Sequence, residues 1–185
     1  MKKMIPIVVA VIIVVGGLSA WQLAKTKKTT STNKSTVSTQ VLPVSNNPIQ
    51  NTSEQAGLII TSAAVEDNAD PVTKQAISDR LQISLQNTSL QTMSNLEIYY
   101  QMKDTKTGQT EAYHQVLTGL QLAPNETKTI YFDNEAGAGH YPENKYSLYR
   151  SSKNEVDFTI QVSAPGFKPA TSTTKKSAGT GETAG

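Results

Sequence analysis

The chain has 185 residues, a formal net charge of +2 and no cysteine. This length predicts one domain with flanking segments, and the lack of cysteine excludes a disulfide framework, a thiol nucleophile and thiolate metal ligands. Residues 1–55 carry six lysines against one acid, whereas residues 56–168 carry nine basic and thirteen acidic residues. Because nucleic-acid binding needs basic side chains clustered on a folded face, the composition argues against a nucleic-acid partner.

Residues 4–24, MIPIVVAVIIVVGGLSAWQLA, are uncharged and mostly apolar. A helix of about 20 such residues spans the hydrocarbon core of a bilayer, whereas the hydrophobic region of a cleaved signal peptide has only about 7–15 residues. Trp21 suits the membrane–water interface, and three lysines follow it closely. We therefore expect residues 1–25 to form an uncleaved signal-anchor transmembrane helix that binds the membrane through residues 4–24. A cleaved signal peptide is the alternative.

Two polar segments are predicted to flank the folded part. Residues 26–55 are dominated by Ser, Thr, Asn, Gln and Lys without helical or alternating pattern, and too little apolar surface is available to offset the backbone entropy of folding. They are expected to be a disordered linker, and residues 169–185 a disordered C-terminal tail. Lysines on both sides of the apolar segment nearly balance the positive-inside rule. We expect a single-pass protein of the cell membrane with its C-terminal domain outside, because the linker has the composition of a surface tether.

Between these flanks, residues 56–168 show the two-residue alternation of half-buried strands. It is strongest in three segments: RLQISLQNTS (80–89), NLEIYYQMKD (95–104) and EVDFTIQVSAPG (155–166). Shorter strands are expected at residues 58–65, 110–117, 127–133 and 146–150. Turn residues separate these segments, and none has a convincing amphipathic helical period. The pattern predicts an all-β fold, an immunoglobulin-like antiparallel β-sandwich preceded by a single transmembrane helix.

Residues 81–110 and 117–132 also carry a family resemblance: LQISLQNTSLQTMSNLEIYYQMKDTKTGQT and LTGLQLAPNETKTIYF. They resemble small bacterial extracytoplasmic Ig-like domains of the FxLYD or adhesion-associated type. In those domains a strand, an Asn-rich turn, a long strand and an Asp-x-x-x-Gly hairpin precede an L-x-P-G-E-T segment. Here Asp104 and Gly108 occupy the hairpin, whereas Asn125 replaces the usual glycine. The resemblance implies an accessory or binding domain of the cell envelope and transfers no catalytic residue.

A glycine-rich stretch, AGAGHYPENKYSLY (136–149), is predicted to form the contact site, because loops carry binding residues more often than sheet faces do. The residues expected to contact a ligand are His140, Tyr141, Glu143, Asn144 and Tyr146. The structural alternative is that Tyr141 and Pro142 pin a crossover between the sheets. The second histidine, His114, is expected at the surface or rim of a strand.

Two acidic stretches, VEDNADP (65–71) and FDNE (132–135), suggest calcium. Calcium takes six to eight oxygen ligands, so the predicted site combines both stretches at one end of the sandwich. The predicted ligands are Glu66, Asp67, Asp70, Asp133 and Glu135. The spacing does not match an EF-hand loop, and solvated turn acids are the alternative. No other cofactor is expected.

The sequence contains no nucleophile motif, regular metal-ligand spacing or phosphate-binding loop, so we expect a protein that is not an enzyme. The expected function is a membrane-tethered binding or adhesion module with a protein or glycan partner at the cell envelope. Glycan binding would use exposed aromatic rings, for which the candidates are Tyr99, Tyr113, Tyr131 and Tyr149. The alternative function is a structural or assembly subunit of an envelope membrane complex, and fold alone does not decide between them.

Overall fold

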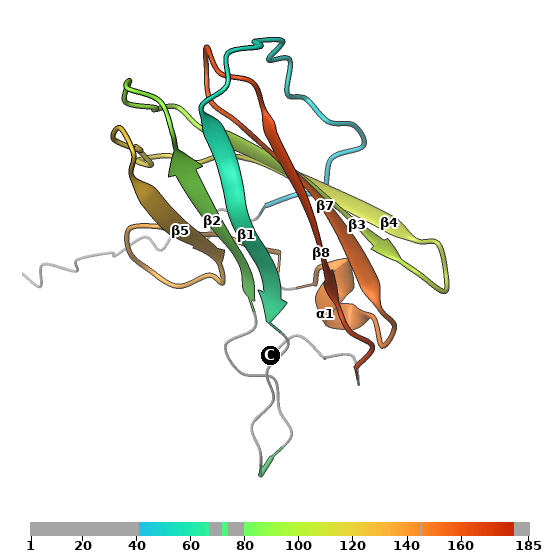
Figure 1. Cartoon of the computed structure of the whole chain (residues 1–185). Coiled ribbons are helices and arrows are strands. Elements are labelled where there is room, and N and C mark those ends of the chain that lie inside the picture. Colours follow the sequence, from blue (N-terminus) through green and yellow to red (C-terminus); the bar gives the residue numbers. More distant parts are fainter. Residues whose placement is uncertain (1–40, 67–71, 74–79, 145, 180–185) are drawn as a thin grey trace, which may run out of the picture. The chain divides into compact units, whose positions relative to one another are not determined.

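The computed structural model describes residues 41–66, 72–73, 80–144 and 146–179 (Figure 1). These residues form two four-stranded sheets and one short helix. The predicted transmembrane segment lies outside the described residues. Within the described part of the chain, no helix is long and apolar enough to cross a membrane.

The first sheet has the strand order β1-β2-β5-β6 and the second the order β4-β3-β7-β8. The strands of the first sheet are β1 (Leu58–Glu66), β2 (Arg80–Asn87), β5 (Thr127–Phe132) and β6 (His140–Tyr141). Those of the second are β3 (Glu97–Asp104), β4 (Thr110–Val116), β7 (Val156–Ser163) and β8 (Ala170–Lys176). All neighbouring strands are antiparallel except β5 and β6, which are parallel. The prediction of an all-β sandwich is confirmed.

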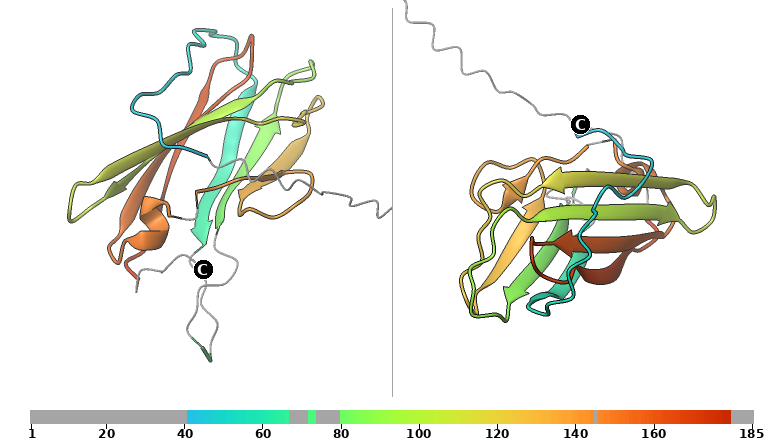
Figure 2. Two further views of the ribbon diagram at one scale, coloured as in Figure 1. Left: turned by 180° about the vertical axis from the view of Figure 1, so that it is seen from behind. Right: turned by 90° about the horizontal axis from the view of Figure 1, so that it is seen from above.

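The sheets form two layers (Figure 2). Hydrophobic side chains fill the space between them. In β2, Leu81, Ile83 and Leu85 are fully buried, whereas the side chains between them are only partly buried. The strands β3 and β7 show the same alternation. Each of these aliphatic side chains contributes about 1.5–3 kcal/mol by its burial. The two-residue alternation predicted for these three segments is therefore confirmed.

The two sheets contact each other along both sides of the sandwich. On one side β1 packs against β8. On the other side, the edge strands β4 and β6 are bridged by Gln115, whose Nε2 donates a 2.9 Å hydrogen bond to the carbonyl oxygen of Pro142. This second side holds the residues of the candidate site.

The predicted disordered tail is wrong for residues 170–176, which form β8. This strand pairs with β7 in continuous antiparallel register, from Val162 opposite Ala170 to Val156 opposite Lys176. Most of its side chains are Ser, Thr and Lys, so the strand is held largely by backbone pairing that composition does not reveal. The sandwich therefore extends beyond the predicted boundary at residue 168.

The predicted disordered linker is wrong for residues 41–55, which lie along the second sheet (Figure 2). The backbone N–H of Val44 donates to the carbonyl oxygen of Ala112 in β4 at 2.8 Å. The side-chain amide of Asn51 donates to the hydroxyl oxygen of Ser163 and to the carbonyl oxygens of Ala164 and Phe167. Asparagine hydrogen bonds thus hold a segment that buries little apolar surface.

The strand predicted at residues 146–150 is also wrong, because the helix α1 (Leu148–Ser151) occupies most of that segment. Leu148 and Tyr149 are adjacent and both buried. A strand would point adjacent side chains to opposite faces, whereas one helical turn packed against β3 buries both.

Candidate functional site

The path of the chain after β5 brings His140 back to the edge of the first sheet. The loop 133–139 returns beside β5, so that His140 lies opposite Tyr131 in the parallel register of β6. The N–H of Tyr131 donates to the carbonyl oxygen of Gly139 at 2.8 Å. Gly139 has φ +85°, a conformation that strains any residue with a side chain. Glycine at position 139 therefore permits the return of the chain that positions His140.

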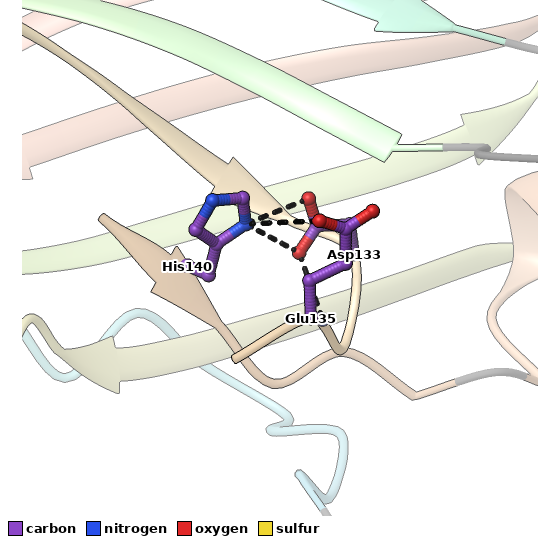
Figure 3. Close-up of side chains that lie close together, drawn as sticks. All are labelled: Asp133, Glu135 and His140. Carbon is purple, nitrogen blue, oxygen red and sulfur yellow. Dashed lines mark hydrogen bonds and ion pairs between the residues drawn. The ribbon is translucent and has the colours of Figure 1, made fainter. Parts of the chain in front are cut away.

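Three potential metal ligands converge at this point: Asp133, Glu135 and His140 (Figure 3). Nδ1 of His140 lies 3.0 Å from both carboxylate oxygens of Asp133 and 4.0 Å from Oε2 of Glu135. The exposed fractions of the side chains are 3% for Asp133, 21% for His140 and 59% for Glu135. One ligand atom from each residue lies within 4.8 Å of the others. We refer to these three residues as the triad.

Side chains on the outer face of the first sheet fix the imidazole of His140. Its ring stacks on Tyr131, with 5.1 Å between ring centroids and 21° between the planes. The guanidinium of Arg80 lies 4.8 Å from the centroid of the same Tyr131 ring and donates through Nε to Glu66 at 2.6 Å. The hydrogen bond that Arg80 donates to Glu66 raises the pKa of Arg80. The orientation of His140 is therefore set by ring packing as well as by the carboxylates.

The structure brings together only part of the predicted calcium site. Asp133 and Glu135 belong to the triad, whereas Glu66 is paired with Arg80. Asp67 and Asp70 lie outside the described residues. His140 is predicted from the sequence only as a contact residue, and no sequence signal indicates that it lies beside these acids.

Two of the predicted contact residues are buried in the structure. The ring of Tyr141 packs against Phe132, with 5.8 Å between centroids, and burial raises the pKa of its hydroxyl. The carboxylate of Glu143 accepts hydrogen bonds from the Tyr149 hydroxyl at 3.1 Å and from Arg150 Nη2 at 2.9 Å. Tyr141 therefore packs into the core, and Glu143 links the residues after β6 to the helix α1.

The other predicted contact residues differ in exposure. Nδ2 of Asn144 donates to the hydroxyl oxygen of Tyr113 at 3.0 Å, and Tyr113 in turn donates to Glu111. Burial is the main reason why the pKa of the Tyr113 hydroxyl is raised, and the hydrogen bond to Glu111 raises it further. The side chain of Tyr146 is exposed. Of the five predicted contact residues, Tyr146 is thus the most accessible and His140 is partly so.

Two grooves flank the segment 140–141. The first, with a volume of about 510 Å³, lies between this segment and the edge strand β4. The second, with a volume of about 530 Å³, lies between this segment, β5 and the turn at residues 118–120. Leu42 and Val116 line the first groove and are 65% and 59% exposed. Two exposed apolar side chains therefore lie in the first groove, which His140 of the triad also lines.

His114 lines the same groove from β4. Its side chain is partly buried, and Nε2 lies 2.8 Å from Oε2 of Glu97. This matches the rim position expected from its alternation with the buried Tyr113. Both histidines of the chain thus face one groove.

The tyrosines considered for glycan binding do not form one exposed platform. Tyr113 and Tyr149 are buried, contrary to the outward orientation considered for them. Tyr99 lies on β3 and Tyr131 on β5, in different sheets, and both are partly buried. These four rings therefore do not offer one shared exposed surface on which a glycan could stack.

No protein-family model matches the chain, and no curated protein matches its sequence. Among solved structures, a protein from Bordetella pertussis assigned to ApaA is 14% identical, with a TM-score of 0.39, over 67% of this chain and 94% of that protein. A β-glucosidase involved in saponin metabolism from intestinal bacteria is 16% identical, with a TM-score of 0.35, over 65% of this chain and 16% of the enzyme. At these scores neither protein indicates a fold or a function for this chain.

Proposed function

We propose that the chain is a non-catalytic binding or adhesion module of the cell envelope, with an immunoglobulin-like sandwich held at the membrane by residues 4–24. The strand orders β1-β2-β5 and β4-β3-β7-β8 correspond to A-B-E and C′-C-F-G of the immunoglobulin fold. The short strand β6 takes the place beside E that strand D holds in that fold, although it follows E in the chain. The length and apolar composition of residues 4–24 support the membrane attachment.

The observation that carries the proposed binding role is the first groove. Leu42 and Val116 leave apolar surface in contact with water beside the imidazole of His140, which Tyr131 and Asp133 hold in place. Binding sites combine apolar walls with a few oriented polar groups in this way. An envelope protein segment is the proposed partner, because the groove runs along an edge strand whose backbone groups can pair with an extended chain.

Substitution within the groove tests this role. The full-length protein is bound to isolated cell-envelope fragments, with Val116→Asp as the groove variant and Leu90→Asp as the control. Leu90 is 87% exposed in a turn that does not line the groove. We expect Val116→Asp to reduce retention and Leu90→Asp to leave it unchanged. Equal retention of both variants would contradict the groove as the contact surface.

Protease treatment of the envelope fragments then distinguishes the classes of partner. A protein partner predicts that retention is lost after treatment, whereas a glycan partner predicts that retention survives. Protease applied to intact cells tests the orientation separately. We expect the sandwich to be cleaved without lysis, and a sandwich protected until the cells are lysed would contradict an outside location.

The alternative function, an assembly subunit, is favoured by the edge of β4. Val44 covers this edge at Ala112, and the groove opens farther along at His114 and Val116. An uncovered strand edge is a common site for pairing with another chain. A photoreactive residue at position 116 distinguishes the two functions in membranes. Cross-linking to a subunit of a membrane complex supports assembly, and cross-linking to a partner outside the membrane supports the binding module.

A further inference from the structure

We infer that Asp133, Glu135 and His140 bind one divalent ion of the first-row transition metals, with Zn²⁺ as the representative ion. This inference does not depend on the proposed binding role. It rests on three observations of the triad: its distances, its charge and the way His140 is held.

The distances in the triad are close to those that a metal requires. Ligand atoms about 2.1 Å from a tetrahedral ion lie roughly 3.4 Å from one another. The separations from Nδ1 of His140 are 3.0 Å to Asp133 and 4.0 Å to Glu135, on either side of that value. Small movements of side chains therefore suffice to accommodate the ion. Glu135 is the more exposed acid and has the freedom to make such a movement.

The charges of the triad favour a cation. Two carboxylates face one imidazole, and that of Asp133 is almost completely removed from water. A buried carboxylate is costly unless a positive or hydrogen-bonding group compensates it. The carboxylate of Asp133 accepts a hydrogen bond from the N–H of Glu135 and faces Nδ1 of His140, whereas Arg80 on the adjacent strand donates to Glu66. A divalent ion between the three ligands would balance both carboxylates.

The imidazole of His140 is held by contacts outside the triad. Tyr131 stacks on its ring, and the carbonyl oxygen of Gly139 accepts a hydrogen bond from the N–H of Tyr131. Metal sites depend on surrounding groups that orient the ligands in this way before the ion arrives. Nδ1 therefore points towards the carboxylates for reasons of packing as well as hydrogen bonding.

The ligand types select the metal class. Calcium prefers oxygen ligands throughout, whereas Zn²⁺ binds imidazole nitrogen and carboxylate oxygen together. Three protein ligands leave a fourth position for water or for a group from a partner. The triad thus favours a transition-metal ion over the calcium predicted from the acidic residues alone.

Binding requires a proton-free Nδ1 on His140. The ion replaces the hydrogen bond between Nδ1 and Asp133, so the imidazole proton moves to Nε2 or, from the imidazolium, is released to solvent.

Isothermal titration of the full-length chain with ZnCl₂ tests the site. The protein carries no polyhistidine tag, so its two histidines are the only imidazoles present. We expect one saturable site per chain, weakened tenfold or more by His140→Ala. His114→Ala is the matched control, because His114 also faces a carboxylate, that of Glu97, but lies outside the triad. Its affinity for Zn²⁺ should equal that of the natural chain.

A second variant separates metal binding from folding. Glu135→Gln changes an exposed side chain, so it should weaken Zn²⁺ binding by about tenfold while leaving the unfolding temperature in EDTA unchanged. The inference is overturned by absence of saturable binding, by equal losses in His114→Ala and His140→Ala, or by full affinity in Glu135→Gln. Calcium binding as tight as zinc binding and unaffected by His140→Ala would also overturn it.

Discussion

The ammonium group of Lys176, at the end of the last strand, donates a 2.7 Å hydrogen bond to the backbone carbonyl oxygen of Tyr149. The same group donates to the carbonyl oxygen of Ser152 at 2.6 Å. Lys176 is only 2% exposed, so its charge is satisfied mainly within the protein. These bonds satisfy carbonyl groups at the C-terminal end of α1, where a cation is favourable. A residue assigned by composition to a disordered tail therefore fixes the helix beside the core.

Removing the ammonium group of Lys176 should destabilise the domain. Lys176→Met keeps most of the side-chain volume but leaves the carbonyl oxygens of Tyr149 and Ser152 without the ammonium donor. We expect the free energy of unfolding to fall by about 2 kcal/mol, measured by urea denaturation of the full-length chain. Lys175→Met is the control: its ammonium group is exposed and paired with Glu155, and exposed pairs contribute at most about 1 kcal/mol. Equal effects of the two variants would contradict the role of Lys176.

The ion pair between Glu143 and Arg150 predicts that Glu143 acts in stability. The side chains of Glu143 and Arg150 are 2% and 17% exposed, and Nη2 of Arg150 lies 2.9 Å from the carboxylate. Glu143→Ala leaves the guanidinium without this partner, and removal of one member of a buried pair costs about 3–5 kcal/mol. Glu135→Ala, in the loop before β6 and exposed, should cost under about 1 kcal/mol when measured in EDTA. An unchanged unfolding free energy for Glu143→Ala would leave ligand contact as its role.

The inner strands could be predicted from sequence because their burial follows a period of two. Ile98, Tyr100 and Met102 alternate with more exposed residues in β3. This alternation is visible in the sequence as apolar residues at every second position. Hydrogen bonding by the backbone has no such period. The strand β8 is rich in Ser and Thr and pairs through its backbone, so composition gave no indication of its position.

The candidate site could be predicted only in parts. Asp133 and Glu135 suggested a cation and His140 suggested contact, but their proximity depends on the path of the loop between β5 and β6. That path uses Gly139 in a left-handed conformation and a parallel pairing of only two residues. Parallel neighbours usually need a long crossover, so a return over seven residues was not indicated by any pattern.

The backbone conformation of Asn125, in the turn before β5, limits which residues are tolerated at this position. Asn125 has φ +60°, and in the family resemblance a glycine occupies this position. Asparagine and glycine adopt the left-handed region at low cost, whereas alanine pays about 1 kcal/mol. Asn125→Ala should therefore lower the free energy of unfolding by about that amount, and Asn125→Gly should change it by less. Equal losses in the two variants, measured by urea denaturation, would contradict the conformational explanation.

The hairpin residue Asp104 predicts a loss of stability in acid. Hydrogen bonds from Ser152 Oγ at 2.6 Å, from the N–H of Thr107 and from Asn154 hold the pKa of Asp104 well below its usual range. An unfolded aspartate has a pKa near 3.9. As the pH falls below about 5, the unfolded chain takes up a proton at this position before the folded chain does, so the folded state loses stability.

The substitution Asp104→Asn isolates this contribution. At pH 7 the variant should unfold at lower urea concentration than the natural chain, because Asn has one acceptor oxygen where the carboxylate has two. One carboxylate oxygen accepts from the N–H of Thr107, and the other accepts from Ser152 and Asn154. As the pH falls from 5 to 3, the difference in unfolding free energy should shrink, since only the natural chain loses the contribution of the Asp104 carboxylate. Ser152→Ala removes the strongest of the bonds to that carboxylate and should reproduce part of the same narrowing. A difference that stays constant from pH 7 to pH 3 would show that these bonds do not favour the ionised form.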